Sequence, residues 1–215
     1  MTPFFDRHDA GKKLAHALHE YKDVANALVL GLPRGGVEVA AVVAAELNAP
    51  LDIVVSRKIG APGNPELAVG AVSQDGKTFI DDATVDLLSI SKETLAELTA
   101  TEKKEAEQRV ETYRADLPEQ DFTGKTVIVV DDGIATGFTM LAALATVKKL
   151  GAVQVIAAVP VASQDALAQL KRTADHVVVL HTPDHFTAIS TYYHKFPQVS
   201  DAQVIAILHP TPEEI

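Results

Sequence analysis

Four β-branched residues in succession, Val127–Val130, run directly into two adjacent carboxylates, Asp131 and Asp132. An uninterrupted β-branched run is typical of a strand whose two faces are both covered, as at the centre of a parallel sheet. A short loop of Gly, Thr and small residues follows the carboxylates, and a helix is expected from Phe138. This segment therefore predicts a strand–loop–helix unit of an α/β fold.

The loop of this unit carries groups that suit a sugar phosphate. Its backbone N–H groups lie at the start of the expected helix, where unpaired donors and the helix dipole favour a phosphate. Thr136 and Thr139 add hydroxyl donors, and Asp131 and Asp132 suit sugar hydroxyls or a hydrated divalent cation. The alternative is a tight turn with acidic residues at a solvated strand end.

Other nucleotide-binding and catalytic loops do not match the spacing. A Walker A loop requires a Lys after its second Gly, whereas Phe138 follows Gly137 here. The chain contains neither the G-x-G-x-x-G fingerprint of dinucleotide-binding proteins nor the G-x-S-x-G elbow of α/β-hydrolases.

Residues 127–139 resemble the phosphoribosyl-pyrophosphate (PRPP) binding motif of the type I phosphoribosyltransferases. In that motif four apolar residues precede two acidic ones and a small-residue loop with Thr-Gly and a further Thr, and each position is matched here. The resemblance implies that the two carboxylates face the ribose hydroxyls and that the loop wraps the 5′-phosphate, with Mg²⁺ carried in with PRPP at Asp131 and Asp132. The expected PRPP-binding residues are Asp131, Asp132, Gly133, Ile134, Ala135, Thr136, Gly137 and Thr139.

A second anion site is expected at Gly31–Gly36, which is similar to the pyrophosphate loop of that family. Its glycines let the backbone approach an anion, the following helix start adds N–H donors, and Arg34 can fork onto phosphate oxygens. Arg57 and Lys58, at the end of an expected strand 52–56, resemble a basic pair that faces pyrophosphate; the alternative is a solvated strand terminus. The expected pyrophosphate-binding residues are Pro33, Arg34, Gly35, Gly36, Arg57 and Lys58.

Strands and helices alternate along the chain, which predicts a doubly wound, mainly parallel sheet with helices on both faces. Parallel strands are expected at 27–30, 52–56, 126–130, 153–159 and 176–180, and a hairpin at 68–73 and 77–80. Helices are expected at about 36–47, 91–114 and 138–150, and residues 59–66 are expected to form a loop that closes over the site. We expect one domain over residues 1–215, with a hood at about 1–10 and 182–215 and a helical insert at about 84–116.

Aromatic residues near the chain ends, in the segments 4–7 and 192–199, could stack on a nucleobase or could seal the core. Three histidines, His176, His181 and His185, fall in one region, but their spacing matches no metal motif, and ordinary surface or hydrogen-bonded histidines are favoured.

Composition and net charge exclude or disfavour several classes of protein. Hydrophobic residues make up 47% of the chain, which excludes general disorder, and no apolar run is long enough for a membrane span. The net charge of −10 disfavours nucleic acid as a partner, and the absence of Cys fits a reducing compartment. A cytoplasmic protein is expected.

The resemblance to the type I phosphoribosyltransferases implies transfer of a phosphoribosyl group from PRPP to a nitrogen acceptor such as a nucleobase, with Asp132, Asp131, Arg34 and Lys58 as catalytic residues. The expected partners are PRPP, the acceptor and, in a homodimer, a second copy of the chain. A non-catalytic PRPP or nucleotide sensor is the main alternative. A phosphohydrolase with Asp131 as nucleophile is a weaker one.

Overall fold

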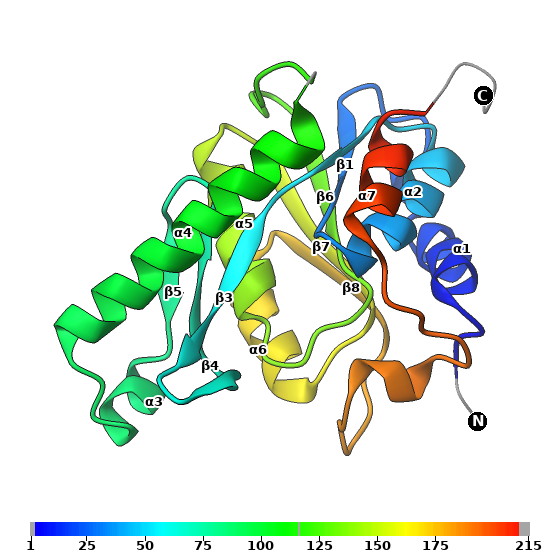
Figure 1. The fold of residues 1–215 in the computed structure, drawn as a ribbon. Coiled ribbons are helices and arrows are strands. Elements are labelled where there is room, and N and C mark those ends of the chain that lie inside the picture. The colour runs from blue at the N-terminus through cyan, green and yellow to red at the C-terminus, as the bar shows by residue number, and fades with distance from the viewer. Residues whose placement is uncertain (1–2, 116, 211–215) are drawn as a thin grey trace.

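A five-stranded parallel sheet with helices on both faces forms the centre of the computed structural model, which describes residues 3–115 and 117–210 (Figure 1). The side chain of Glu66 also lies outside the described part. The strand order is β2-β1-β6-β7-β8, and the bounds are β1 Ala27–Gly31, β2 Leu51–Ile53, β6 Thr126–Val130, β7 Gln154–Val161 and β8 His176–His181. This confirms the predicted fold class.

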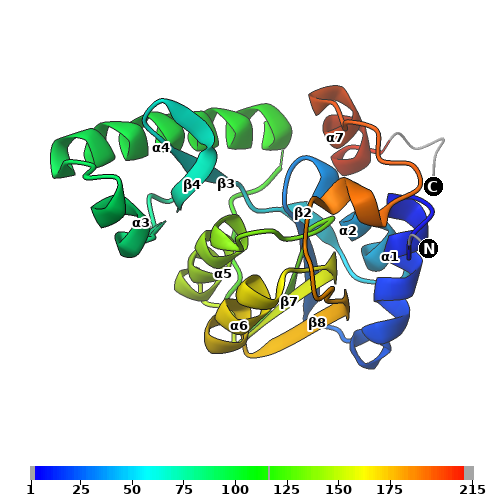
Figure 2. The same ribbon diagram turned by 90° about the horizontal axis from the view of Figure 1, so that it is seen from below.

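Helices α1 (Arg7–Ala17) and α2 (Gly35–Leu47) cover one face of the sheet, and α5 (Phe138–Lys149) and α6 (Gln164–Thr173) cover the other (Figure 2). Because successive residues of a strand point to opposite faces, the buried strand β6 contributes to both layers. Val127 and Val129 pack with α5 and α6, whereas Ile128 and Val130 pack with α1 and α2. This double burial is the physical reason for the unbroken β-branched run. Neither α1 nor α6 was among the helices predicted from the sequence.

A second sheet departs from the expected arrangement of residues 52–66. The parallel strand β2 ends at Ile53, and Ser56–Ala61 form β3, which pairs antiparallel with β4 (Asn64–Ser73). The predicted strand 52–56 is therefore wrong in its second half, and most of the predicted loop 59–66 is strand. The turn lies at Pro62 and Gly63, and the register shifts beside Gly60, where a bulge tolerates the Pro65 that follows in β4.

The predicted hairpin at 68–73 and 77–80 is confirmed: β4 pairs antiparallel with β5 (Thr78–Ile80). A short helix, α3 (Asp82–Leu87), and the long α4 (Lys92–Arg114) follow, and α4 packs along β3 and β4 (Figure 1). Ser91 caps α4 as predicted, and the buried residues of this helix are Ala106 and Tyr113. We call β3, β4, β5, α3 and α4 the arm.

A segment near the start of the chain pairs with a segment at residue 193. Phe4 forms a parallel bridge with Tyr193, next to the short 3₁₀ helix η2 (Ile189–Tyr192), and α7 (Asp201–Leu208) follows. A second 3₁₀ turn, η1 (His19–Tyr21), follows α1. Residues 7–10 belong to a helix that covers the sheet, so the expected hood segment 1–10 overlaps the core. The division into domain, hood and insert stays a prediction.

Candidate functional site

The two predicted anion loops meet at the carboxyl ends of neighbouring strands. β1 and β6 are paired in parallel, with Gly31 opposite Val130, and the Leu32 N–H donates to the Val130 carbonyl at 2.9 Å. The helix after β1 covers one face of the sheet and the helix after β6 covers the other. This is the topological switch point at which open α/β sheets bind ligands.

Glycines let these two loops pack against each other without a gap. A Cβ added to Gly35 would lie 1.9 Å from Asp132 Oδ2, and one added to Gly36 would lie 2.8 Å from the Asp131 Cα. The Pro33–Arg34 peptide bond in the first loop is cis. The backbone of the expected pyrophosphate loop is thus in direct contact with the carboxylate pair.

The Asp132 carboxylate is buried and paired. Arg7 Nε, in the first turn of α1, donates to Asp132 Oδ2 at 2.8 Å, and the Tyr193 hydroxyl donates to the Asp132 carbonyl at 2.5 Å. Burial raises the pKa of Asp132, and the charge and hydrogen bond of Arg7 act against that rise. Burial, followed by the charge of Asp132, raises the pKa of Tyr193 well above its ordinary value.

Asp131 lies beside Asp132 and shares its enclosed surroundings. Burial, followed by the charge of Asp132, raises the pKa of Asp131 well above its ordinary value. Asp131 Oδ1 accepts a hydrogen bond from the Asp132 backbone N–H at 2.8 Å. Asp131 is partly exposed, and adjacent carboxylate oxygens are groups of the kind that accept hydrogen bonds from hydroxyl donors or coordinate a divalent cation.

The expected phosphate loop is anchored at its middle and open at its tip. The Ile134 N–H donates to the Val161 carbonyl at 2.9 Å, and Ser163 Oγ donates to the Ala135 carbonyl at 2.6 Å. Ala135 and Thr136 are exposed, and Gly137 adopts φ +86° where α5 begins. No side chain among the described residues caps α5, and its first turn contains no acid, so its first N–H groups suit an anion.

The basic residues predicted to bind pyrophosphate lie in different places. Arg34 is at the β1 loop, with its Nη1 3.7 Å from Asp201 Oδ1. Arg34 also lines a cavity of about 320 Å³ together with Arg7 and Gly35. Arg57 lies within β3, not at the end of a parallel strand, and its Nε donates to Glu102 Oε2 of α4 at 2.8 Å. Lys58 is the next residue of β3. Binding of pyrophosphate by Arg57 and Lys58 stays a prediction.

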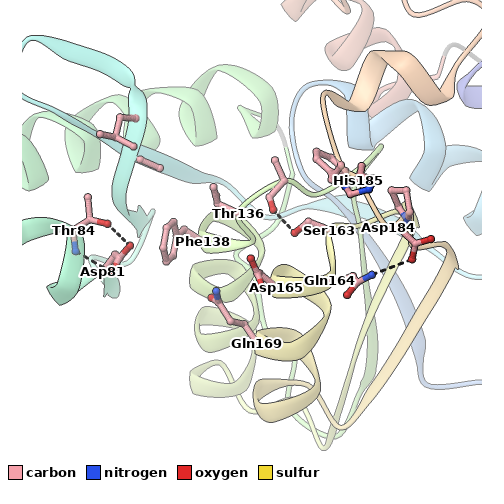
Figure 3. Close-up of a pocket in the computed structure, with 15 residues that line it drawn as sticks. Asp81, Thr84, Thr136, Phe138, Ser163, Gln164, Asp165, Gln169, Asp184 and His185 are labelled. Carbon is pink, nitrogen blue, oxygen red and sulfur yellow. Dashed lines mark hydrogen bonds between the residues drawn. The ribbon is translucent and has the colours of Figure 1, made fainter.

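A larger cavity of about 740 Å³ adjoins the exposed tip of the phosphate loop at Thr136 (Figure 3). It lies between the arm, the starts of α5 and α6, and the segment that follows β8. Its apolar lining consists of Leu67, Ala68, Ala135, Phe138, Pro183 and Phe186, and its acidic lining consists of Asp81, Asp165 and Asp184. Neither Asp131 nor Asp132 lines it.

Most aromatic side chains at the chain ends seal the core. Phe4, Tyr192 and Tyr193 are buried and pack with one another, whereas Phe5 is half exposed and lies over His194. Base stacking and sealing were both open from the sequence, and the burial favours sealing. Sequence patterns did not single out Arg7, Tyr193 or Ser163 as residues that contact the loops. Arg7 and Tyr193 belong to the segments 4–7 and 192–199, which were selected only for their aromatic residues.

The part of the chain that the structure describes contains neither a membrane-spanning helix nor a cluster of metal ligands. None of the helices in residues 3–115 and 117–210 is long and apolar enough to cross a membrane. Within the same ranges no three His, Asp or Glu side chains gather closely enough to hold a metal on their own. A metal at Asp131 and Asp132 would therefore depend on ligands from a substrate or water.

The fold and the two loops define an α/β protein of the phosphoribosyltransferase kind. The model of the family described as "Phosphoribosyl transferase domain" matches residues 6–197, so the chain belongs to that family of transferases.

Individual relatives agree with this assignment. The chain is 43% identical over 211 residues to the Mycobacterium tuberculosis (strain H37Rv) protein named "Putative phosphoribosyl transferase Rv0571c", and the match covers 97% of this chain and 47% of that relative. The chain thus spans about half the length of the curated relatives it matches. The protein TT1426 from Thermus thermophilus is 43% identical, with a TM-score of 0.79 over 95% of this chain and 97% of that one. The AQ2163 protein from Aquifex aeolicus, 11% identical with a TM-score of 0.51 over 82% of this chain and 74% of that one, shares the fold.

Proposed function

We propose that this protein transfers the 5-phosphoribosyl group of PRPP to a nitrogen atom of a nucleobase and releases pyrophosphate. One observation carries the proposal: the uncapped start of α5, the Asp131–Asp132 pair and the Gly35–Gly36 loop lie side by side at the carboxyl ends of β1 and β6. These groups match the phosphate, ribose and pyrophosphate of one PRPP molecule, in that order.

The proposed reaction is a displacement at the anomeric carbon. The acceptor nitrogen forms a bond to C1′, the C1′–oxygen bond breaks, and pyrophosphate leaves with the electron pair. The nitrogen then loses its proton. Asp131 and Asp132 hold the ribose hydroxyls and offset positive charge that develops on the ring, while Arg34 and Lys58 offset the charge of the departing pyrophosphate.

Mg²⁺ fits the donor chemistry of the site. Asp131 and Asp132 provide adjacent carboxylate oxygens, and Mg²⁺ commonly takes one or two carboxylates and completes its shell with phosphate oxygens and water. When bound, Mg²⁺ would neutralise charge on the pyrophosphate. The two carboxylates would hold it from the protein side.

We place the acceptor in the 740 Å³ cavity, because it adjoins the phosphate loop and is large enough for a heterocycle. Phe138 and Phe186 offer apolar surface, and Asp165 and Asp184 offer hydrogen-bond acceptors. Neither Arg nor Lys is among the described side chains that line this cavity. The cavity therefore suits a neutral or cationic base with N–H donors and disfavours an acceptor that carries a carboxylate.

This function would place the protein in nucleotide metabolism, in salvage of bases, in the cytoplasm. A homodimer remains a proposal as well. The rival is a sensor that binds PRPP without turnover. One observation favours this alternative. Arg57 and Lys58 lie in the arm, and Arg57 is hydrogen-bonded to Glu102 there, although both were expected to bind pyrophosphate.

The test measures pyrophosphate release from PRPP and MgCl₂ in the presence of adenine, guanine, hypoxanthine, uracil or orotate. Release that depends on one of the neutral bases, with none for the carboxylate-bearing orotate, is the expected result. PRPP binding without base-dependent release would favour the sensor. Labelled phosphate trapped on Asp131 would instead favour the phosphohydrolase.

A further inference from the structure

We propose that Arg7 is a positioning residue that fixes the Asp132 carboxylate for PRPP, an inference that rests on the proposed function. Arg7 stands in the first turn of α1, 125 residues before Asp132, in a segment outside both anion loops. Through Arg7, the packing of α1 against residues 196–197 would determine the geometry of the candidate catalytic pair.

Contacts hold the Arg7 guanidinium in one orientation. The side chain is buried, with the residue 5% exposed, and its Nη1 donates to the Pro197 carbonyl at 2.6 Å. Its Cζ lies 3.8 Å from the centre of the Phe196 ring, and Nη1 lies 3.5 Å from Glu38 Oε2. A planar guanidinium with a ring on one face and acceptors at its edge keeps its remaining donors aimed in fixed directions.

One of those fixed donors meets Asp132. Nε lies 2.8 Å from Asp132 Oδ2, the same oxygen that touches the position of an added Gly35 Cβ. The carboxylate is therefore held between α1 and the expected pyrophosphate loop. The Tyr193 hydroxyl donates to the Asp132 backbone carbonyl at 2.5 Å. Side chain and backbone of Asp132 are thus both fixed by the terminal segments.

A purely structural role, in which Arg7 joins α1 to residues 196–197, is the competing explanation. In that case loss of Arg7 would lower the stability of the fold, and any effect on PRPP binding would add to the effect of Asp132→Asn. If Arg7 acts through Asp132, removing both side chains costs PRPP binding no more than removing Asp132 alone. A double-mutant cycle separates the two cases because only groups that act through each other are non-additive.

The experiment measures the Kd of PRPP with MgCl₂ by calorimetry, and pyrophosphate release, for wild type, Arg7→Met, Asp132→Asn and the double variant. Arg7→Met is expected to weaken PRPP binding at least tenfold, and the double variant is expected to match Asp132→Asn within about twofold. Arg7→Lys keeps the charge and should recover part of the loss. The control is Lys13→Met, which breaks the exposed 2.7 Å pair with Asp9 on the same helix and should leave PRPP affinity unchanged.

Additive losses in the double variant, or wild-type affinity in Arg7→Met, would overturn the role of Arg7. If Arg7→Met does not fold, as judged by circular dichroism, the cycle is run with Arg7→Lys and the same criterion applies. If the wild-type protein neither binds nor consumes PRPP, the proposed function is wrong, and this result is obtained before Arg7 is altered. That failure is distinct from additivity in a protein that does bind PRPP.

Discussion

Gly35 lies so close to Asp132 that a single added carbon on Gly35 would stand 1.9 Å from the Asp132 Oδ2 atom. Gly35, the first residue of α2, and Asp132, which follows β6, are therefore in direct contact, although they lie far apart in the sequence. Only a residue without a side chain fits between the two loops in this arrangement.

Gly35→Ala should therefore displace the Asp132 carboxylate from Arg7. We expect a loss of about 1–3 kcal/mol in the free energy of unfolding from overpacking, and a loss of PRPP affinity of at least tenfold. Gly124→Ala is the control: its added carbon meets no atom within 4 Å, although its φ of +73° makes Ala unfavourable. The control should lose stability and keep PRPP affinity. Equal affinities in both variants would contradict the proposed contact between the loops.

Tyr193→Phe removes the hydroxyl that donates to the Asp132 carbonyl at 2.5 Å. Because this contact is buried, we expect the free energy of unfolding to fall by about 1–3 kcal/mol and PRPP binding to weaken. Tyr192→Phe is a matched control, since the Tyr192 hydroxyl donates to the His185 carbonyl at a longer 3.3 Å. Urea unfolding and PRPP titration compare the two variants. A larger effect of Tyr192→Phe on PRPP would count against the role of Tyr193.

Ser163→Ala should loosen the phosphate loop. Ser163 Oγ accepts from the Ala166 N–H at 3.1 Å as the N-cap of α6 and donates to the Ala135 carbonyl at 2.6 Å. Loss of a cap alone costs about 1 kcal/mol. Ser91→Ala removes an equivalent cap, 3.1 Å from the Thr94 N–H, in the arm. We expect similar losses of stability in both variants and a several-fold weaker PRPP affinity in Ser163→Ala alone. Unchanged PRPP affinity in Ser163→Ala would show that this anchor does not shape the loop.

Asp75 joins the β4–β5 turn to α5. Burial acts to raise its pKa, but hydrogen bonds from Lys149, Ser73 and Thr146 outweigh it and lower the pKa from 3.8 to about 2. The ionised form therefore stabilises the fold above about pH 4, and this contribution disappears as the pH falls from about 4 to about 2. Allowing for screening at the half-exposed Lys149, Asp75→Asn should cost about 1–2 kcal/mol at pH 7.

The pH series provides the check on Asp75. Urea unfolding of wild type and Asp75→Asn at pH 7, 4 and 3 should give a difference that shrinks toward the lowest pH. Glu119→Gln, at an exposed position near the same turn, should stay within about 0.5 kcal/mol throughout. A difference between Asp75→Asn and wild type that does not change with pH would show that the charge of Asp75 is not responsible.

Local sequence patterns predicted the central sheet well because its strands are buried on both faces. Val127–Val130 and the helix that follows carry signals that depend on their own residues alone, and their bounds were predicted to within a residue. The carboxyl ends of parallel strands lie at one edge of a sheet, so both anion loops were expected at that edge. The contact of Gly35 with Asp132 depends on the pairing of β1 with β6, which no local pattern predicted.

Other features depended on contacts that no local pattern records. Residues 59–66 contain Gly and Pro and were expected as a loop, but pairing of β3 with β4 and packing of α4 make most of them strand. Arg7 was indistinguishable in the sequence from a surface arginine. Its role arises because α1 packs beside α2 and Phe4 pairs with Tyr193, which brings Arg7 to the end of β6.

The most direct measurement titrates PRPP with MgCl₂ into the wild-type protein and into Asp132→Asn and Arg34→Ala, and follows pyrophosphate release in the same samples. Wild type should bind one PRPP and release pyrophosphate with an accepted base. Each variant should fold but lose on the order of a hundredfold in turnover. No heat of binding in the wild type, or normal turnover in both variants, would contradict the assignment of this site to PRPP.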